Sequence, residues 1–144
     1  MKISARNVEI VYGIVPVRFE NDKPLFLILQ NKSFYEFPKG HKDKNETDLE
    51  AAIRETYEES GLEPSSLTFP WGRDSKETDA YKKGRKAVRY FVALTTQKEI
   101  KLRFNPELGR AEHDNYLWAT YDEAKDILGD RLKKILDWAM SKIK

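Results

Sequence analysis

Three glutamates, Glu55, Glu58 and Glu59, fall within little more than one turn of a segment that should be helical. They belong to the stretch GHKDKNETDLEAAIRETYEESGL, Gly40–Leu62, which holds seven acidic side chains in 23 residues. Like charges three or four residues apart destabilise a helix by about 0.2–0.5 kcal/mol per pair. A bound divalent cation would relieve this repulsion, and ligation by carboxylates suits hard ions such as magnesium, manganese or calcium.

The ordinary alternative for neighbouring glutamates is a solvated acidic face. Here the nearest cation in sequence is Arg54, which on a helix should lie toward Glu50 and Glu58. It can then steady one edge of the cluster without neutralising it, and no lysine lies on the same face. The spacing therefore favours a metal site over a solvated face.

The residue types that are missing narrow the chemistry further. The chain has no cysteine and two histidines, His41 and His113, so sulfur-ligated zinc or iron sites and thiolate nucleophiles are excluded, and we expect any metal to be held by oxygen or by these histidines. A length of 144 residues predicts a single domain, residues 1–144. We expect a cytoplasmic protein without a membrane partner, because no segment resembles a signal peptide or reaches the roughly 18 apolar residues of a membrane span.

Positive charge gathers in the segment YKKGRKAVR, Tyr81–Arg89, although the net charge is only +2. This segment is either the solvated tip of a hairpin or a patch for a polyanionic ligand.

The elements that must position these residues can be read from the apolar pattern. Strands are expected at 8–19 and 24–29 as an antiparallel pair, and further strands at 67–71, 87–96 and 115–121. A capping box at Thr47 begins the acidic helix, and Gly61 ends it, with Leu62 packing on Tyr57 in a Schellman motif. Its buried face should comprise Leu49, Ala52, Ile53, Thr56 and Tyr57. A helical region follows over 122–142, divided at Gly129.

The spacing of Gly40, Glu46 and the run RETYEESGL, residues 54–62, resembles the Nudix box of the Nudix hydrolases. Thr56 departs from the pattern, since the family usually has an aliphatic residue there. The order of strands, box helix and terminal helix is also similar to the whole Nudix fold, an α/β/α sandwich around a mixed sheet. The resemblance implies magnesium-dependent hydrolysis, with manganese as a substitute, of a nucleoside diphosphate linked to another moiety, by attack of water on phosphorus.

The resemblance also implies roles for particular residues. Glu58, Glu59 and the carbonyl of Gly40 become metal ligands, and Glu55 becomes either a further ligand or, as we favour, the base. Arg54 and Glu46 become orienting groups at the catalytic centre. A further carboxylate often comes from outside the box, for which Glu112 is the first candidate and Glu107 the competing one.

The segments FPKGH, AVRYFVA and EHDNYLWAT resemble those of the Nudix subgroup that cleaves diadenosine tetraphosphate asymmetrically to ATP and AMP. Candidate contacts with such a substrate are Lys39 and His41 at a phosphate, Lys83 and Arg85 along the polyphosphate, and Tyr81, Tyr90 and Tyr116 as rings that stack on adenine. For Tyr90 and Tyr116 the alternative is core packing, and for Lys39 and His41 it is a surface loop.

Other functions remain open from the sequence. Related enzymes act on diphosphoinositol polyphosphates or on the 5′-triphosphate of RNA, which we do not favour. A non-catalytic nucleotide sensor of the Nudix fold would not need all three box glutamates, and a small calcium-binding domain would not explain the spacing of Gly40 and Arg54. The sequence also leaves open whether the protein is a monomer or a homodimer.

Overall fold

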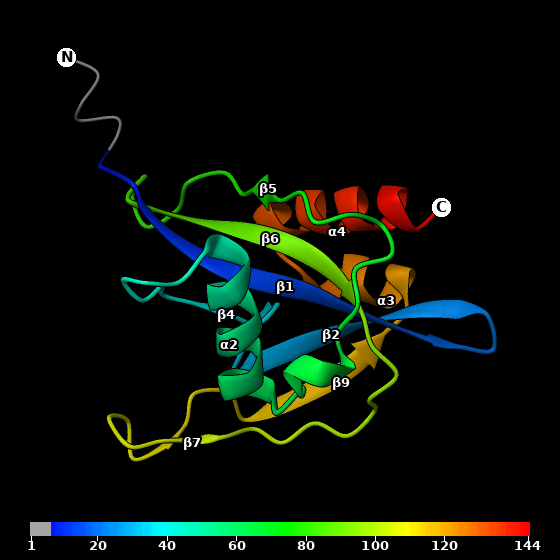
Figure 1. Ribbon diagram of the computed structural model, residues 1–144, viewed down its shortest axis with the longest axis horizontal. Coiled ribbons are helices and arrows are strands. Elements are labelled where there is room, and N and C mark those ends of the chain that lie inside the picture. Colours follow the sequence, from blue (N-terminus) through cyan, green and yellow to red (C-terminus); the bar gives the residue numbers. More distant parts are fainter. Residues whose placement is uncertain (1–6) are drawn as a thin grey trace.

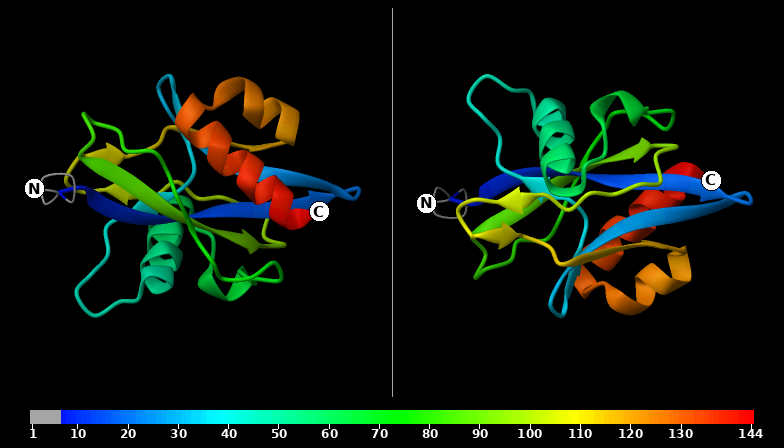
Figure 2. Two further views of the ribbon diagram at one scale, coloured as in Figure 1. Left: turned by 90° about the horizontal axis from the view of Figure 1, so that it is seen from above. Right: turned by 90° about the horizontal axis from the view of Figure 1, so that it is seen from below.

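One mixed β-sheet, covered by helices on both faces, forms the protein. A computed structural model describes residues 7–144, and Figures 1 and 2 show α2 on one face of the sheet and α3 with α4 on the other. The predicted α/β/α sandwich is therefore confirmed. The elements are β1 (Glu9–Glu20), β2 (Lys23–Asn31), β3 (Phe34–Glu36), β4 (Lys39–Gly40), α2 (Asp48–Ser60), η1 (Pro64–Ser66), β5 (Lys76–Glu77), β6 (Lys86–Leu94), β7 (Phe104–Asn105), β8 (Arg110–Ala111), β9 (Asn115–Ala119), α3 (Tyr121–Ile127) and α4 (Asp130–Ile143).

Strand β1 runs through the middle of the sheet. It pairs parallel with β6 from Glu9 opposite Lys86 to Val17 opposite Leu94, and antiparallel with β2 and β4. Strand β9 pairs with β2, and β3 and β5 complete the sheet. Residues 11–18 of β1 are all buried, which explains why its sequence is a nearly unbroken apolar run. The expected antiparallel pair at the start of the chain is confirmed.

Alternate side chains along the strands pack into two hydrophobic cores, one on each face of the sheet. Val15 and Ile28 lie in the core beneath α3 and α4, whereas Ile14 and Leu27 lie in the core beneath α2. Tyr90 belongs to the first core, where it is 0% exposed and makes an edge contact with Phe37. The prediction that Tyr90 stacks on a substrate base is therefore wrong, because its ring has no accessible face.

Helix α2 begins and ends at the residues that the sequence indicated. Thr47 Oγ1 accepts from the Glu50 N–H at 3.1 Å, and the Glu50 side chain accepts from the Thr47 N–H at 2.9 Å. Gly61 has φ 77° and its N–H donates to the Tyr57 carbonyl at 2.8 Å. The predicted Schellman motif is wrong, because the Leu62 N–H donates instead to Ser60 Oγ, leaving the simpler single-bond cap.

Of the remaining expected elements, the division of the terminal helix is confirmed and the short strand at 67–71 is not. The terminal region divides at Gly129 into α3 and α4, as predicted. The strand expected at 67–71 is reduced to one bridge between Thr68 and Leu94. Within residues 7–144, no helix combines the length and the hydropathy that crossing a membrane requires.

Candidate functional site

Arg54 is the centre of the ionic network on α2. Its Nε and one terminal nitrogen bind both oxygens of Glu46 at 2.6 and 3.0 Å, and its other terminal nitrogen reaches Glu55 and Glu58 at 3.1 Å each. It also donates to the carbonyl of His41 at 2.8 Å. Arg54 thus reaches Glu55 as well as the expected Glu58, but its single charge is shared with Glu46, so it does not neutralise the cluster.

This network fixes the protonation of the groups it joins. Hydrogen bonds from Arg54 lower the pKa of Glu46 to about 2, so Glu46 is a permanent anion that holds the guanidinium in place. Burial raises the pKa of Glu55, and the charge of Glu58 adds to this, while Arg54 opposes it. Glu55 thus holds a proton more readily than an ordinary glutamate does.

Gly40 lies directly against Glu55. A Cβ atom at position 40 would come within 2.1 Å of the Glu55 carboxyl group. Gly40 pairs with Tyr12 of β1 through strand β4, so the sheet fixes its position while α2 brings Glu55 to it. A glycine is needed here for this close approach rather than for an unusual backbone conformation.

Glu59 points into the protein rather than toward solvent. Its Oε1 accepts from the backbone N–H of Lys39 at 3.0 Å. Burial raises the pKa of Glu59 well above its ordinary value; Lys39 opposes this rise, and Glu112 and Glu36 reinforce it. An ionised Glu59 therefore requires positive charge that these residues supply only in part.

The lysine beside Glu59 belongs to a second ionic group that the sequence analysis missed. Lys39 Nζ lies 3.1 Å from Glu36, whose other oxygen lies 2.7 Å from Nε2 of the buried His113. Burial raises the pKa of Glu36, but the hydrogen bond from His113 and the charge of Lys39 outweigh it and hold the pKa at about 2. Burial likewise lowers the pKa of Lys39, and the charges of Glu36 and Glu59 outweigh it and raise the pKa to about 12.

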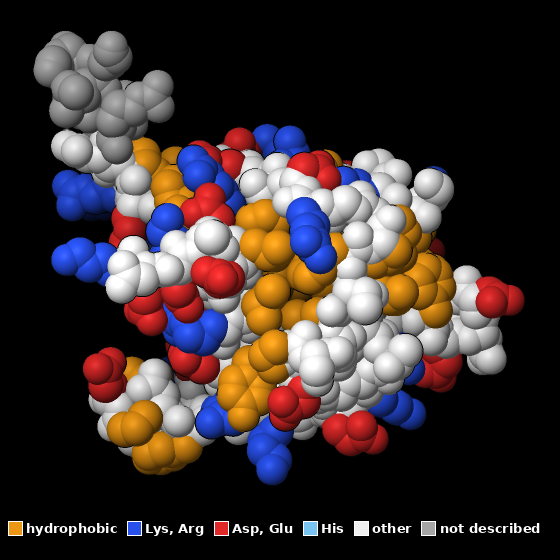
Figure 3. Space-filling view, viewed as in Figure 1, with side chains coloured by type: hydrophobic (Ala, Val, Ile, Leu, Met, Phe, Trp, Pro, Cys, Tyr) orange, Lys and Arg blue, Asp and Glu red, His pale blue; other side chains and the backbone are white. Residues whose placement is uncertain are grey.

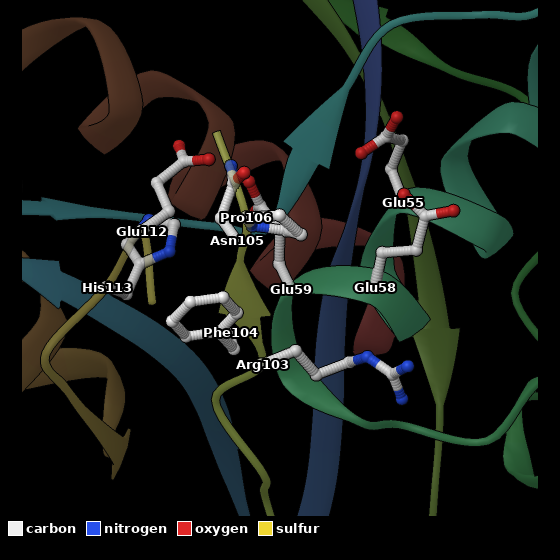
Figure 4. A pocket seen from close by; sticks show the side chains of 9 residues that line it. All are labelled: Glu55, Glu58, Glu59, Arg103, Phe104, Asn105, Pro106, Glu112 and His113. Carbon is white, nitrogen blue, oxygen red and sulfur yellow. The ribbon is translucent and has the colours of Figure 1, made fainter. Parts of the chain in front are cut away.

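The box carboxylates face a cavity of about 360 Å³ between α2 and the β7–β8 hairpin, which comprises β7, β8 and the turn joining them. Figure 3 shows this hollow on the left of the molecule, with acidic side chains above it and the hydrophobic tip of the hairpin below. In Figure 4, Glu112 and His113 lie on one side of the cavity and Glu55 and Glu58 on the other. The remaining lining residues are Glu59, Arg103, Phe104, Asn105 and Pro106.

A second, smaller cavity of about 140 Å³ adjoins the first, since both are lined by Glu55, Glu59 and Glu112. Its other lining residues are Val11, Lys39, Gly40, His41 and Lys86. The larger cavity is therefore acidic, whereas in the smaller one two lysines and a histidine lie among three of the same carboxylates.

Several predicted residues meet at these cavities. The structure brings together Gly40, Glu55, Glu58, Glu59 and Glu112, with Lys39 and His41 beside them. Glu107 lies on the exposed turn of the hairpin and lines neither cavity, so Glu112 is the better candidate of the two.

Other predicted substrate contacts lie elsewhere. Lys83 and Arg85 are exposed in the turn before β6 and line neither cavity. Tyr81 is half-buried, with the guanidinium of Arg131 3.9 Å from its ring centroid. Tyr116 is exposed on β9 but also lines neither cavity. In this conformation, the structure does not gather these four residues at the site.

Lys86 was predicted only as part of the basic segment, and its place opposite Glu9 at the start of β6 brings it to the cavity. Arg103 and Phe104 are among the lining residues that the sequence did not indicate, and Phe104 is 66% exposed at the rim. An isolated aromatic in a polar loop was the available signal for Phe104.

The donor set fits a hard divalent cation. The acidic cavity presents the carboxylates of Glu55, Glu58, Glu59 and Glu112, and its lining contains no sulfur ligand. Glu36, Glu112 and His113 also bring ligand atoms within 4.8 Å of one another. That second group fits a cation poorly, because both oxygens of Glu36 are engaged by His113 and Lys39.

Comparison with known proteins agrees with this geometry. The family model described as NUDIX domain matches residues 10–139. The chain is 34% identical over 110 residues to a Rattus norvegicus protein named bis(5′-nucleosyl)-tetraphosphatase [asymmetrical], covering 74% of this chain and 71% of that protein. It is 34% identical over 133 residues to the Caenorhabditis elegans protein of the same name, covering 85% and 90%.

A solved structure is similar over most of its length. The crystal structure of a C. elegans Ap4A hydrolase binary complex superposes with a TM-score of 0.81 and 27% identity, covering 94% of this chain and 98% of that one.

The contact between Gly40 and Glu55 predicts the effect of adding one methyl group. In Gly40→Ala the new Cβ must displace the Glu55 carboxyl group, so the affinity for Mn²⁺, measured by calorimetry, should fall by roughly tenfold or more. Gly129→Ala is the matched control, because a Cβ there meets no atom within 4 Å. Equal affinities of Gly40→Ala and the wild type would contradict the prediction.

The lowered pKa of Glu36 predicts a pH dependence of stability. Its folded-state pKa of about 2 lies below the ordinary value of 4.5, so the stabilisation is present above pH 4.5 and is lost as the pH falls toward 2. The shift corresponds to about 3 kcal/mol. The free energy of unfolding, measured with urea from pH 7 to pH 2, should therefore fall more for the wild type than for Glu36→Gln. The difference between the two proteins should shrink by about 3 kcal/mol.

A pH-independent difference between wild type and Glu36→Gln would contradict this. Glu77→Gln serves as the control, because its partner Arg89 lies on the surface and such pairs contribute little.

Proposed function

The chain belongs to the Nudix family, and from this premise we propose that it cleaves dinucleoside polyphosphates, converting diadenosine tetraphosphate to ATP and AMP. The observation that carries this proposal is the pair of adjoining cavities that share Glu55, Glu59 and Glu112, the larger lined mainly by carboxylates and the smaller also by two lysines and a histidine. The names of the relatives at 34% identity support the same substrate.

The two-part site suits a polyphosphate for an electrostatic reason. Phosphate oxygens are repelled by carboxylates, so the acidic cavity can accept a phosphate only through bound cations. The smaller cavity offers Lys39 and Lys86, together with His41, to phosphates farther along the substrate. A substrate with several consecutive phosphates can occupy both parts at once.

We assign the cation as Mg²⁺, with Mn²⁺ as a substitute, held by Glu58, Glu59, Glu112 and the carbonyl of Gly40. When bound, it screens the charge of the phosphates and lowers the pKa of a bound water. Burial and Glu58 raise the pKa of Glu55, which suits the acceptance of a proton from the attacking water. Arg54 holds Glu55 by a hydrogen bond of 3.1 Å, and Glu46 holds Arg54 through both of its oxygens.

The nucleoside ends of the substrate need apolar or aromatic contacts. Phe104 offers an exposed ring at the rim of the acidic cavity, and base stacking on an aromatic ring contributes about 1–3 kcal/mol. Tyr116 and Tyr81, with Lys83 and Arg85, remain proposed contacts that would require the substrate to extend beyond the cavities. A cytoplasmic location and a monomeric or dimeric state also stay predictions from the sequence.

Substrate hydrolysis tests the proposal directly. With Mg²⁺ and a panel of dinucleoside polyphosphates, nucleotide sugars, deoxynucleoside triphosphates, diphosphoinositol polyphosphates and 5′-triphosphorylated RNA, ion-exchange chromatography should detect ATP and AMP from diadenosine tetraphosphate as the fastest reaction. Glu58→Gln should lower kcat by orders of magnitude with an unchanged circular dichroism spectrum. If another compound of the panel is cleaved faster, that compound replaces diadenosine tetraphosphate as the proposed substrate. Nucleotide binding without cleavage would instead favour a non-catalytic sensor.

Phe104 and Phe34 form a matched pair for testing the base contact. Both rings are exposed, at 66% and 77%, but Phe34 lines neither cavity. Phe104→Ala should raise KM for diadenosine tetraphosphate by roughly fivefold or more with little change in kcat, because a stacking contact is lost. Phe34→Ala should leave both constants unchanged. Equal effects of the two substitutions would remove Phe104 from the binding site.

A further inference from the structure

We propose that His113 and Glu36 form a buried anchor that positions the carboxylate of Glu112 at the acidic cavity. The inference deepens the proposed function and rests on it. Neither residue belongs to the Nudix box, and Glu36 lies 77 positions before His113 in the chain. Both are positioning residues, since the role assigned to them is exercised through Glu112.

The anchor lies where the β7–β8 hairpin rejoins the sheet. Among the described residues, the backbone and side-chain hydrogen bonds of residues 104–111 all stay within the hairpin. Contacts with the sheet resume at His113, which binds Glu36, and at Asp114, whose N–H donates to the Gln30 carbonyl at 2.9 Å. Glu112 immediately precedes this attachment, so its place depends on it.

The contact itself is short and partly buried. His113 is 2% exposed, the Glu36 side chain is 20% exposed, and Nε2 of His113 lies 2.7 Å from Oε2 of Glu36. An ionised carboxylate only accepts hydrogen bonds, so Nε2 carries the proton and donates it. Breaking such a partly buried, charge-assisted hydrogen bond leaves a poorly satisfied charge behind. The anchor therefore resists displacement far more than an exposed ion pair would.

The contact between His113 and Glu36 also distinguishes the carboxylate of Glu36 from that of Glu112. Oxygens of Glu36 and Glu112 and a ring nitrogen of His113 all lie within 4.8 Å of one another. Glu36 is engaged at both oxygens, by His113 and by Lys39 at 3.1 Å. In the described part of the chain, no hydrogen bond reaches the Glu112 carboxylate, which is left free to face the cavity with Glu59.

Lys39 extends the anchor to the helix. Its ammonium binds Glu36, and its backbone N–H donates to Glu59 Oε1 at 3.0 Å. A chain of contacts thus runs from His113 through Glu36 and Lys39 to Glu59. This chain of contacts sets the separation between the carboxylates of Glu112 and Glu59. Figure 4 shows both side chains at the same cavity.

The test compares His113→Leu, which removes the donor, with His113→Gln, whose amide can donate from a similar place. His113→Leu should weaken Mn²⁺ binding, measured by calorimetry, and lower kcat for diadenosine tetraphosphate, each by roughly 10- to 100-fold, with KM changed less than about threefold. His113→Gln should recover most of both. Asp79→Asn, which breaks an exposed ion pair with Lys134, is the control and should match the wild type.

A double-mutant cycle distinguishes positioning from general damage. If His113 acts through Glu112, adding His113→Leu to Glu112→Gln should lower Mn²⁺ affinity no further. An equal loss in both backgrounds overturns the proposal, as does wild-type affinity in His113→Leu. If circular dichroism shows His113→Leu unfolded, Glu36→Gln replaces it in the same cycle. Wild-type protein that takes up no Mn²⁺ and cleaves no dinucleotide instead overturns the proposed function, and this inference with it.

Discussion

The mutual repulsion of carboxylates around one cavity is the constraint on which the rest of the site depends. Four of them line it, and protein cations compensate them unequally. Arg54 binds Glu55 and Glu58 from the solvent side, whereas Glu59 receives only a backbone N–H and the nearby charge of Lys39. The charge left over is concentrated where Glu59 and Glu112 meet, which is where a cation gains most.

This arrangement lowers the stability of the metal-free protein. Burial raises the pKa of Glu59 well above its ordinary value, so ionising it at neutral pH opposes folding. The opposite holds for Glu36, whose pKa of about 2 means that its ionised form supports folding. Two partly buried glutamates linked through Lys39 therefore have opposite effects on stability when they are ionised.

The sequence predicted the parts of the structure that depend on local patterns. The capping box at Thr47, the glycine end of α2, the central strands and the division at Gly129 all follow from signals within a few residues. The Nudix box gave Gly40 and the three helix glutamates for the same reason. Tyr90 was misjudged because alternation places a strand residue on one face of the sheet without saying which face carries the ligand.

What the sequence could not predict are side-chain contacts set by rotamers and contacts across long separations. The reach of Arg54 to Glu55 depends on a rotamer, and the meeting of Glu36 with His113 depends on how the hairpin closes on the sheet. The hairpin carries both Phe104 at the rim and, beside its base, Glu112 at the carboxylates. Since residues 104–111 make their hydrogen bonds within the hairpin, Phe104 is positioned by the hairpin itself, whereas Glu112 is positioned by the attachment to the sheet that begins at His113. In the proposed function, one short segment thus carries both the base contact and a cation ligand, and the attachment at His113 holds the second of them.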